Sequence, residues 1–378
     1  MKIDSFSGIN NVAPPTKLRA GELVAATDVD IDVRGRPVSR RGRTLLAAEP
    51  VVDIFEAPFG IFGRVGNDLK LFSLLGATIR TVYDTLGYDR VNYVLLPDGR
   101  VGFTNGLIQG MATLTETQAW GIPRPPHAGV GSEGKTAYHI TYVRTSDGLE
   151  GPPTYATDLV DGHQLLIGLP ALEGHMIRVY LTFLDHIAHY AGQTATDSFQ
   201  WDGATVGPIV SSSGLDAPPP GKLLHVWNSR VLIAADNVLW ATRPMQPELC
   251  VLTKDFIQFP DEITLLYGNG DGVFVGTSAG LYFLAGRVFE QLKAQQILPG
   301  SAILGSCVEA DLSQLPDKVR PSGVQQGAFC LIDGYIHLLH GAGGVTNLTA
   351  GRYRTSSGEV RATVRMLDGV PHYFASPL

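Results

Sequence analysis

The chain has 378 residues, of which 44% are hydrophobic and 17% are charged, and its formal net charge at pH 7 is −7. This length and hydrophobic content predict two or three folded units and exclude an intrinsically disordered protein. The negative charge argues against a protein that grips nucleic-acid phosphates, and the scarcity of charged residues indicates a surface that contacts other protein.

The N-terminal residues 1–47 are predicted to form an arm for assembly contacts. Residues 1–43 carry eight basic and five acidic side chains, whereas the remaining chain carries 21 basic and 31 acidic ones. An arginine cluster in this arm could neutralise DNA phosphates or pair with carboxylates of a neighbouring protein, and the acidic excess of the remaining chain favours protein. The cluster consists of Arg34, Arg36, Arg40, Arg41 and Arg43.

From residue 48 onward, short β-rich runs alternate with turns rich in Gly, Asn and Asp, and helical periodicity is nearly absent. The best helix candidates are 22–28 and 289–296, each two turns at most. The β-rich runs fall into two blocks, 48–125 and 216–378, which would supply five or six four-stranded blades at roughly 40–45 residues each. We predict that the two blocks form one β-propeller-like domain, because radial closure hides strand edges.

The segment between these blocks, 130–215, is predicted to be an inserted domain. Proline-rich stretches at 121–134 and 217–222 have the composition of linkers. Between them, alternating strands recur at roughly ten-residue spacing, which is typical of a small sandwich. The predicted fold class is therefore all-β: a β-propeller-like domain with an inserted immunoglobulin/fibronectin-like β-sandwich.

Two glycine motifs match functional signatures but lie in the wrong context for them. The G-x-G-x-x-G run at 129–134 follows a proline-rich linker and precedes a strand, whereas a dinucleotide site needs a strand before it and a helix after it. The G-x-S-x-G run at 276–280 lies between two strand-like segments. We therefore interpret it as a hairpin turn and not as a nucleophile elbow.

The remaining reactive side chains also favour a non-enzymatic protein. His186 and His189 are interpreted as a surface or interface pair, because no third metal ligand is evident nearby. Cys250, Cys307 and Cys330 form no C-x-x-C pair and are expected to be buried, reduced thiols. The sequence thus predicts no enzyme, no cofactor and no metal, and it shows neither a secretory signal pattern nor the roughly 18 apolar residues of a membrane span.

A specific resemblance begins in 6–46. This segment holds Asn10 and Asn11, a D-V-D-I-D run at 28–32, Gly35, and R-R-G-R at 40–43. The pattern resembles the opening of bacteriophage virion proteins, namely the tail nozzle or tail-tube hub subunits of short-tailed phages and their packaged-DNA stabilisation relatives. Segment 139–157 is similar to the fibronectin-like insert of these proteins, and segments 225–249 and 271–286 are similar to two of their blades.

The resemblance implies a structural virion protein that forms a hexameric ring in the phage tail. Such a ring continues the DNA channel from portal and adaptor and takes part in genome retention and ejection, with transient passage of double-stranded DNA and no sequence-specific binding. The implied partners are further copies, portal and adaptor proteins, and tail fibre or spike proteins. The implied location is the virion, after synthesis in the cytoplasm of the bacterial host, without membrane insertion.

An acidic channel wall would let a DNA duplex slide, because like charges repel and adhesion is discouraged. The candidate groups are turn carboxylates: Asp98, Asp271, Asp333 and Asp368. The alternative function is a propeller-fold carbohydrate-active or carbohydrate-binding protein. A glycosidase would need two carboxylates at roughly 5–9 Å and exposed aromatic side chains for sugar stacking, whereas most aromatics here occupy alternating strand positions.

Overall fold

The computed structural model describes residues 6–26, 29–31, 36–39, 45, 49–127, 133–155, 165–182, 187–203, 206–315, 321–355, 358–367 and 370–377. Within these residues the helical elements are single 3-10 turns at Pro15–Lys17, Phe289–Gln291 and Leu312–Gln314, and the remaining regular structure is strand. The all-β prediction is confirmed. The helix candidate at 22–28 is wrong in its described part, which begins with a strand at Glu22–Leu23. The candidate at 289–296 forms one 3-10 turn at Phe289–Gln291 before strand pairing begins at Lys293.

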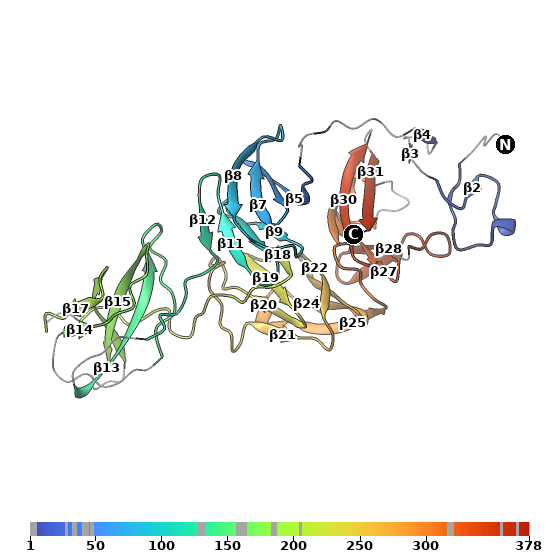
Figure 1. Ribbon diagram of the computed structural model, residues 1–378. Helices are drawn as coiled ribbons and strands as arrows, with labels where there is room; N and C mark the ends of the chain where they lie inside the picture. The colour runs from blue at the N-terminus through green and yellow to red at the C-terminus, as the bar shows by residue number, and fades with distance from the viewer. Residues whose placement is uncertain are drawn as a thin grey trace.

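Five antiparallel sheets of four strands follow one another along the described chain, each strand paired with the next (Figure 1). We refer to them as blades 1 to 5. Blade 1 consists of β5 (Val52–Ala57), β6 (Gly60–Val65), β7 (Asp68–Phe72) and β8 (Thr78–Tyr83). Blade 2 consists of β9 (Asn92–Leu95), β10 (Val101–Thr104), β11 (Gln109–Ala112) and β12 (Thr117–Ala119).

The three remaining blades come after the inserted segment. Blade 3 consists of β18 (Leu223–Trp227), β19 (Arg230–Ala235), β20 (Val238–Ala241) and β21 (Phe256–Gln258). Blade 4 consists of β22 (Ile263–Asn269), β23 (Gly272–Thr277), β24 (Gly280–Ala285) and β25 (Lys293–Pro299). Blade 5 consists of β26 (Val308–Asp311), β27 (Gln326–Ile332), β28 (Tyr335–His340) and β29 (Gly344–Asn347).

The blades stand around a common centre, as in a β-propeller. Their first strands β5, β9, β18, β22 and β26 all line one central cavity, and so does β30 (Val360–Leu367). In the described residues β30 pairs with β31 (Val370–Pro377) alone. The hairpin β30–β31 therefore occupies the position of a sixth blade and supplies two of its strands. The predicted β-propeller-like domain is confirmed.

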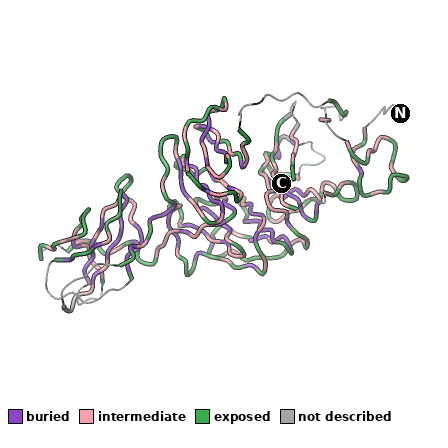
Figure 2. Tube along the Cα trace, viewed as in Figure 1, coloured by how far each residue is buried: buried purple, intermediate pink, exposed green. Residues whose placement is uncertain are grey.

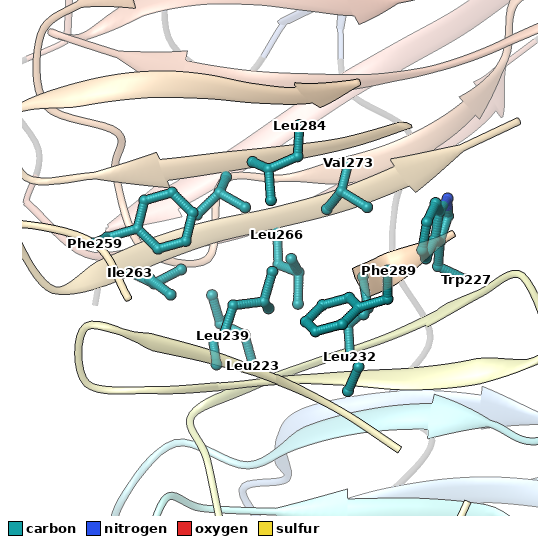
Figure 3. Close-up of a cluster of buried hydrophobic side chains, with 13 residues drawn as sticks. Leu223, Trp227, Leu232, Leu239, Phe259, Ile263, Leu266, Val273, Leu284 and Phe289 are labelled. Carbon is teal, nitrogen blue, oxygen red and sulfur yellow. The ribbon is translucent and has the colours of Figure 1, made fainter. Parts of the chain in front are cut away.

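Hydrophobic cores fill the spaces between consecutive blades. Figure 3 shows the core between blades 3 and 4, where Trp227, Leu232 and Leu266 pack among further buried side chains. Similar clusters join blades 1 and 2, blades 2 and 3, and blades 4 and 5, and a smaller one joins blade 5 to Val364 and Tyr373 of β30–β31. Burying one such side chain contributes roughly 1.5–3 kcal/mol. The clusters of described residues include none between β30–β31 and blade 1.

The turns between strands follow the local sequence closely. Asp333 (φ 50°) and Gly334 (φ 80°) make the two-residue turn between β27 and β28, because paired positive φ values match the twist of a tight hairpin. Ser278 lies in the turn between β23 and β24, where the Thr277 hydroxyl accepts hydrogen bonds from the backbone N–H groups of Ala279 and Gly280, both at 3.2 Å. The G-x-S-x-G run is thus a hairpin turn, as predicted.

The inserted segment forms a unit beside the propeller (Figure 1). Its larger sheet holds β13 (Glu133–Arg144), β15 (His175–Thr182) and β16 (Ala188–Thr194), and its smaller sheet holds β14 (Leu165–Ile167) and β17 (Ser198–Gln200). Buried side chains from both sheets, such as Ile140, Leu166 and Val179, share one core. The segment is therefore a two-layer β unit, and its immunoglobulin or fibronectin type stays a prediction.

The N-terminal arm contains two short pairs of strands. β1 (Gly8–Ile9) pairs in parallel with β2 (Glu22–Leu23), and β3 (Val29–Ile31) pairs antiparallel with β4 (Pro37–Ser39). Figure 2 shows that exposed and half-buried residues dominate this arm, whereas buried residues run through the blades. The arm therefore extends outside the propeller core.

Candidate assembly site

Asn11 ties the N-terminal arm to the end of the propeller. Its backbone N–H donates to the Arg352 carbonyl at 2.9 Å, and its side-chain Nδ2 donates to the Arg354 carbonyl at 2.8 Å. The Arg354 N–H in turn donates to Asn11 Oδ1 at 2.9 Å. The Asn11 amide thus pairs with the Arg354 backbone as a neighbouring strand would.

Asn10 shapes the arm from within. Its Oδ1 accepts a hydrogen bond from the Ala13 N–H at 3.0 Å, and its Nδ2 donates to the Glu22 carboxylate at 3.1 Å. The same carboxylate accepts from the Arg19 N–H at 3.0 Å, and this bond is the main reason that the pKa of Glu22 lies below its usual value. Asn10 and Asn11, adjacent in sequence, therefore hold the arm together and anchor it.

Arg354 links the anchored arm to blade 5. Its Nε donates to the Asp333 carbonyl at 2.8 Å, and its guanidinium lies 5.5 Å from the centre of the Tyr335 ring. The Asp333 carboxylate accepts from the Ser301 N–H at 2.8 Å. Asp333, predicted to face a channel, is thus part of the base on which the arm rests.

The other predicted channel carboxylates have different surroundings. Asp98, in the turn between β9 and β10, pairs with Arg100 at 2.7 Å beside the inserted segment. Asp271 is exposed in the turn between β22 and β23. Asp368 lies outside the described residues. The structure of one chain therefore brings none of the described three, Asp98, Asp271 and Asp333, into the central cavity of the propeller.

Most of the predicted arginine cluster falls outside the described residues, namely Arg34, Arg40, Arg41 and Arg43. Arg36 is described and exposed, and it immediately precedes β4.

Glu248 connects the propeller to the inserted segment. Its buried carboxylate accepts from Arg100 Nη1 of blade 2 at 2.5 Å and from Arg144 Nη2 of β13 at 2.6 Å. Each arginine has a second carboxylate partner, Asp98 for Arg100 and Asp147 for Arg144. Buried charges need such complete pairing, so this network sets how the insert is attached.

A second buried carboxylate, Asp53, lies in the central cavity, whose volume is about 410 Å³. Asp53 Oδ2 accepts from Arg64 Nε at 2.9 Å, and Oδ1 accepts from Arg361 Nε at 3.0 Å and Nη2 at 2.8 Å. A register shift in β5 between Val52 and Phe55, together with φ of 52° at Asp53, turns this side chain toward both arginines. Asp53 therefore joins blade 1 to the β30–β31 hairpin.

His225 occupies the same cavity. Its Nε2 accepts a hydrogen bond from the Gly268 N–H at 2.9 Å, which leaves Nδ1 as the nitrogen that faces Glu309 at 3.3 Å. Burial lowers the pKa of His225, and the Glu309 charge opposes that effect without outweighing it. Burial therefore favours the neutral form of His225.

The three cysteines and the histidine pair offer no reactive arrangement in the part of the chain described. Burial raises the pKa of Cys250 to about 12 and raises the pKa values of Cys307 and Cys330 as well, which disfavours thiolate chemistry. His189 Nδ1 lies 3.4 Å from the Gly207 carbonyl, and His186 lies outside the described residues. Among those described, no three His, Cys, Asp or Glu side chains are grouped to bind a metal ion.

None of the helices in the described part of the chain has the length and apolar character needed to cross a membrane.

Sequence reasoning missed Asp53, Glu248, Arg354 and Arg361. Each acts through a partner far away along the chain, and each looks like an ordinary strand or loop residue in its local window. Asn10 and Asn11 were singled out by the resemblance, but the partner of Asn11 was not. A signal for these pairs would have to come from three-dimensional proximity.

No protein-family model and no curated protein matches this chain. Solved structures with a similar arrangement include a streptogramin B lyase at 9% identity, covering 84% of this chain and 88% of that one with a TM-score of 0.33. They also include the C-terminal WD40 domain of Sif2 at 12% identity, covering 88% of this chain and 81% of that one with a TM-score of 0.35. A computationally designed protein, Ika8, is similar at 10% identity, with 87% and 98% of the two chains covered and a TM-score of 0.28.

Proposed function

We propose that this chain is a structural subunit of a ring in the tail of a short-tailed bacteriophage. In that role it is a nozzle or hub that continues the DNA channel from portal and adaptor and takes part in genome retention and ejection. The observation that carries the proposal is the anchoring of Asn11 on Arg354. It fixes the base of the arm whose sequence resembles these proteins, and it leaves exposed residues of β4 beyond that base.

The chemistry of the central cavity favours a structural role over the carbohydrate-active alternative. A glycosidase needs one carboxyl group as general acid and another as base or nucleophile. The buried carboxylate of this cavity, Asp53, is held by two guanidinium groups. Both of its oxygens are thereby engaged in hydrogen bonds that join blade 1 to the β30–β31 hairpin. Asp53 is thus suited to holding blades together.

In the proposed hexamer, the arm arginines pair with carboxylates of the adjacent subunit or the adaptor. The acidic excess of the remaining chain faces the shared channel, with the exposed Asp271 as the best placed of the described candidates. Screening at physiological salt confines the repulsion between this wall and DNA to roughly 8–10 Å. Duplex DNA would then pass without strong, salt-dependent binding. Portal, adaptor and tail fibre or spike proteins are the proposed partners, and the virion is the proposed location.

The test is the oligomeric state of the purified full-length chain. Native mass spectrometry should show six copies of the 40.5 kDa chain, about 243 kDa, and electron microscopy should show rings with six-fold symmetry. A variant that lacks residues 1–47 should keep its thermal unfolding transition but remain monomeric. A full-length chain that stays monomeric at every concentration and binds oligosaccharides would overturn the proposal in favour of the carbohydrate alternative.

A further inference from the structure

The hairpin β30–β31 has an open edge. Blades 1 to 5 contain four strands each, whereas this sixth position contains two in the described part of the chain, and β31 pairs with β30 alone. The outer edge of β31 therefore presents a row of backbone N–H and C=O groups. Such an edge is a template for a strand from another segment or another molecule. Ala375, Ser376 and Pro377 at the end of β31 are exposed.

A second open edge belongs to the hairpin β3–β4. Its two strands, Val29–Ile31 and Pro37–Ser39, pair with each other and with no further strand among the described residues. An isolated two-stranded hairpin is at best marginally stable in water, so it gains most from joining a larger sheet. Two strands is also the number that the sixth blade lacks.

The faces of the two hairpins have matching chemistry. In β30–β31, Arg365 lies opposite His372 on one face, and Val364 lies opposite Tyr373 on the other, which packs against blade 5. In β3, strand alternation places Asp30 on one face and Val29 on the other. A β3 strand added beside β31 would align Asp30 with the basic face and Val29 with Tyr373. Opposite charges on adjacent strands favour that register.

Among the described residues of a single copy, neither edge has a further partner strand, although both edges belong to the same chain. The sheet that satisfies both is therefore one between copies. The segment 40–51 between β4 and β5 has twelve residues, so it can span up to about 40 Å between the hairpin and blade 1. In a ring, each copy can donate one hairpin and receive one, so this head-to-tail contact can close on itself.

We propose that the β3–β4 hairpin of a second copy adds to the edge of β31 and completes the sixth blade with four strands. This inference rests on the proposed ring and names the contact that joins its subunits. The arm of one copy then belongs to the fold of the next.

Cysteine crosslinking in the full-length chain tests this contact. One preparation carries Val29→Cys, and a second preparation with a larger tag carries Ala375→Cys; after mixing and reassembly, a short bismaleimide is added. We expect a covalent heterodimer of the two tagged chains. A chain carrying both substitutions should give a ladder of covalent oligomers that ends at the size of the ring.

The matched control replaces Val29→Cys by Leu75→Cys, since Leu75 is 87% exposed at the tip between β7 and β8 and far along the chain from the arm. It should give no ladder with Ala375→Cys, and the unsubstituted chain should give none either. A crosslink confined to single chains would assign the hairpin to its own β31 and overturn the inference. Intact rings without any crosslink would overturn it while leaving the proposed function standing, and the absence of rings would overturn both.

Discussion

Arg361, on the last hairpin of the propeller, donates two hydrogen bonds to Asp53 in the first blade, 308 residues earlier. The Asp53 side chain is 1% exposed and also accepts from Arg64. No hydrophobic cluster of described residues lies between β30–β31 and blade 1. The seam of this propeller is therefore held by charge, whereas hydrophobic clusters fill the spaces between the other consecutive blades.

Replacing Arg361 with Ala should destabilise the protein by about 1.5–3 kcal/mol, the usual contribution of hydrogen bonds to a charged group. Arg64 keeps Asp53 partly paired, so the loss should be smaller than for Asp53→Ala. The latter leaves the buried Arg64 guanidinium without its carboxylate and should cost about 3–5 kcal/mol. Urea unfolding measures both values. As a control, Arg287→Ala removes an exposed arginine that bonds the Gly270 carbonyl, and an equal effect there would show that the seam has no special role.

Replacing Asn11 with Ala should release the N-terminal arm. The change removes two hydrogen bonds to the Arg354 backbone, about 1–3 kcal/mol in total, and thus lowers the docked population roughly 5- to 150-fold. Hydrogen exchange of the Arg354 amide and proteolysis within 1–47 should both become faster, while the thermal transition of the propeller stays unchanged. The exposed neighbour Val12, replaced by Ala, serves as the control; unchanged exchange at Arg354 in the Asn11 variant would contradict the anchoring role.

Replacing Glu248 with Gln should loosen the inserted segment. Arg100 and Arg144 would lose their shared buried carboxylate but keep Asp98 and Asp147, so we expect a loss of about 2–4 kcal/mol, below the full cost of breaking a buried pair. Small-angle scattering should report a wider range of insert positions. The same charge removal at Asp147, which is 39% exposed, should cost less than about 1 kcal/mol. Equal effects at the two sites would argue against a central role for Glu248.

Stability should decrease as the pH falls below 6.5. Burial lowers the pKa of His225 in the folded state below its ordinary 6.5. The unfolded chain therefore binds a proton before the folded chain does. The contribution of neutral His225 is complete above pH 6.5 and is lost as the pH falls toward the lowered folded pKa. Urea unfolding from pH 7.5 to 5 should show this slope, and His225→Gln should reduce it. A slope unaffected by the His225 change would assign it to other groups.

The sequence predicts the blades well because each blade is a local structure. Runs such as 264–286 carry apolar strands and glycine or aspartate turns within one short window, and the structure forms hairpins there. The sixth blade is harder to foresee, because among the described residues the chain supplies only two of its strands, β30 and β31. The pattern of 289–296 also shows the limit of local reasoning, since pairing with β24 makes its second half a strand.

The residues of the candidate assembly site also differ in how well the sequence predicts them. Asn10 and Asn11 belong to the short segment that carries the family resemblance, so the sequence singles them out. Arg354 lies in a polar loop, and its local sequence does not indicate that it binds the arm. Glu248 likewise follows a proline-containing stretch and has no local partner, because Arg100 and Arg144 approach it from 148 and 104 residues away. Charge pairs of this kind depend on the closed fold and leave no periodic signal along the chain.

The distance along the chain between Asp53 and Arg361 has a consequence for synthesis. At roughly 5–20 residues per second, about 15–60 s pass between the emergence of blade 1 and that of its closing partner. The Arg354 backbone to which Asn11 binds is translated just before Arg361. A nascent chain can thus neither close its propeller nor dock its arm until translation is nearly complete. The arm becomes fixed only on finished chains, and in the proposed ring this timing would keep incomplete chains out of the assembly.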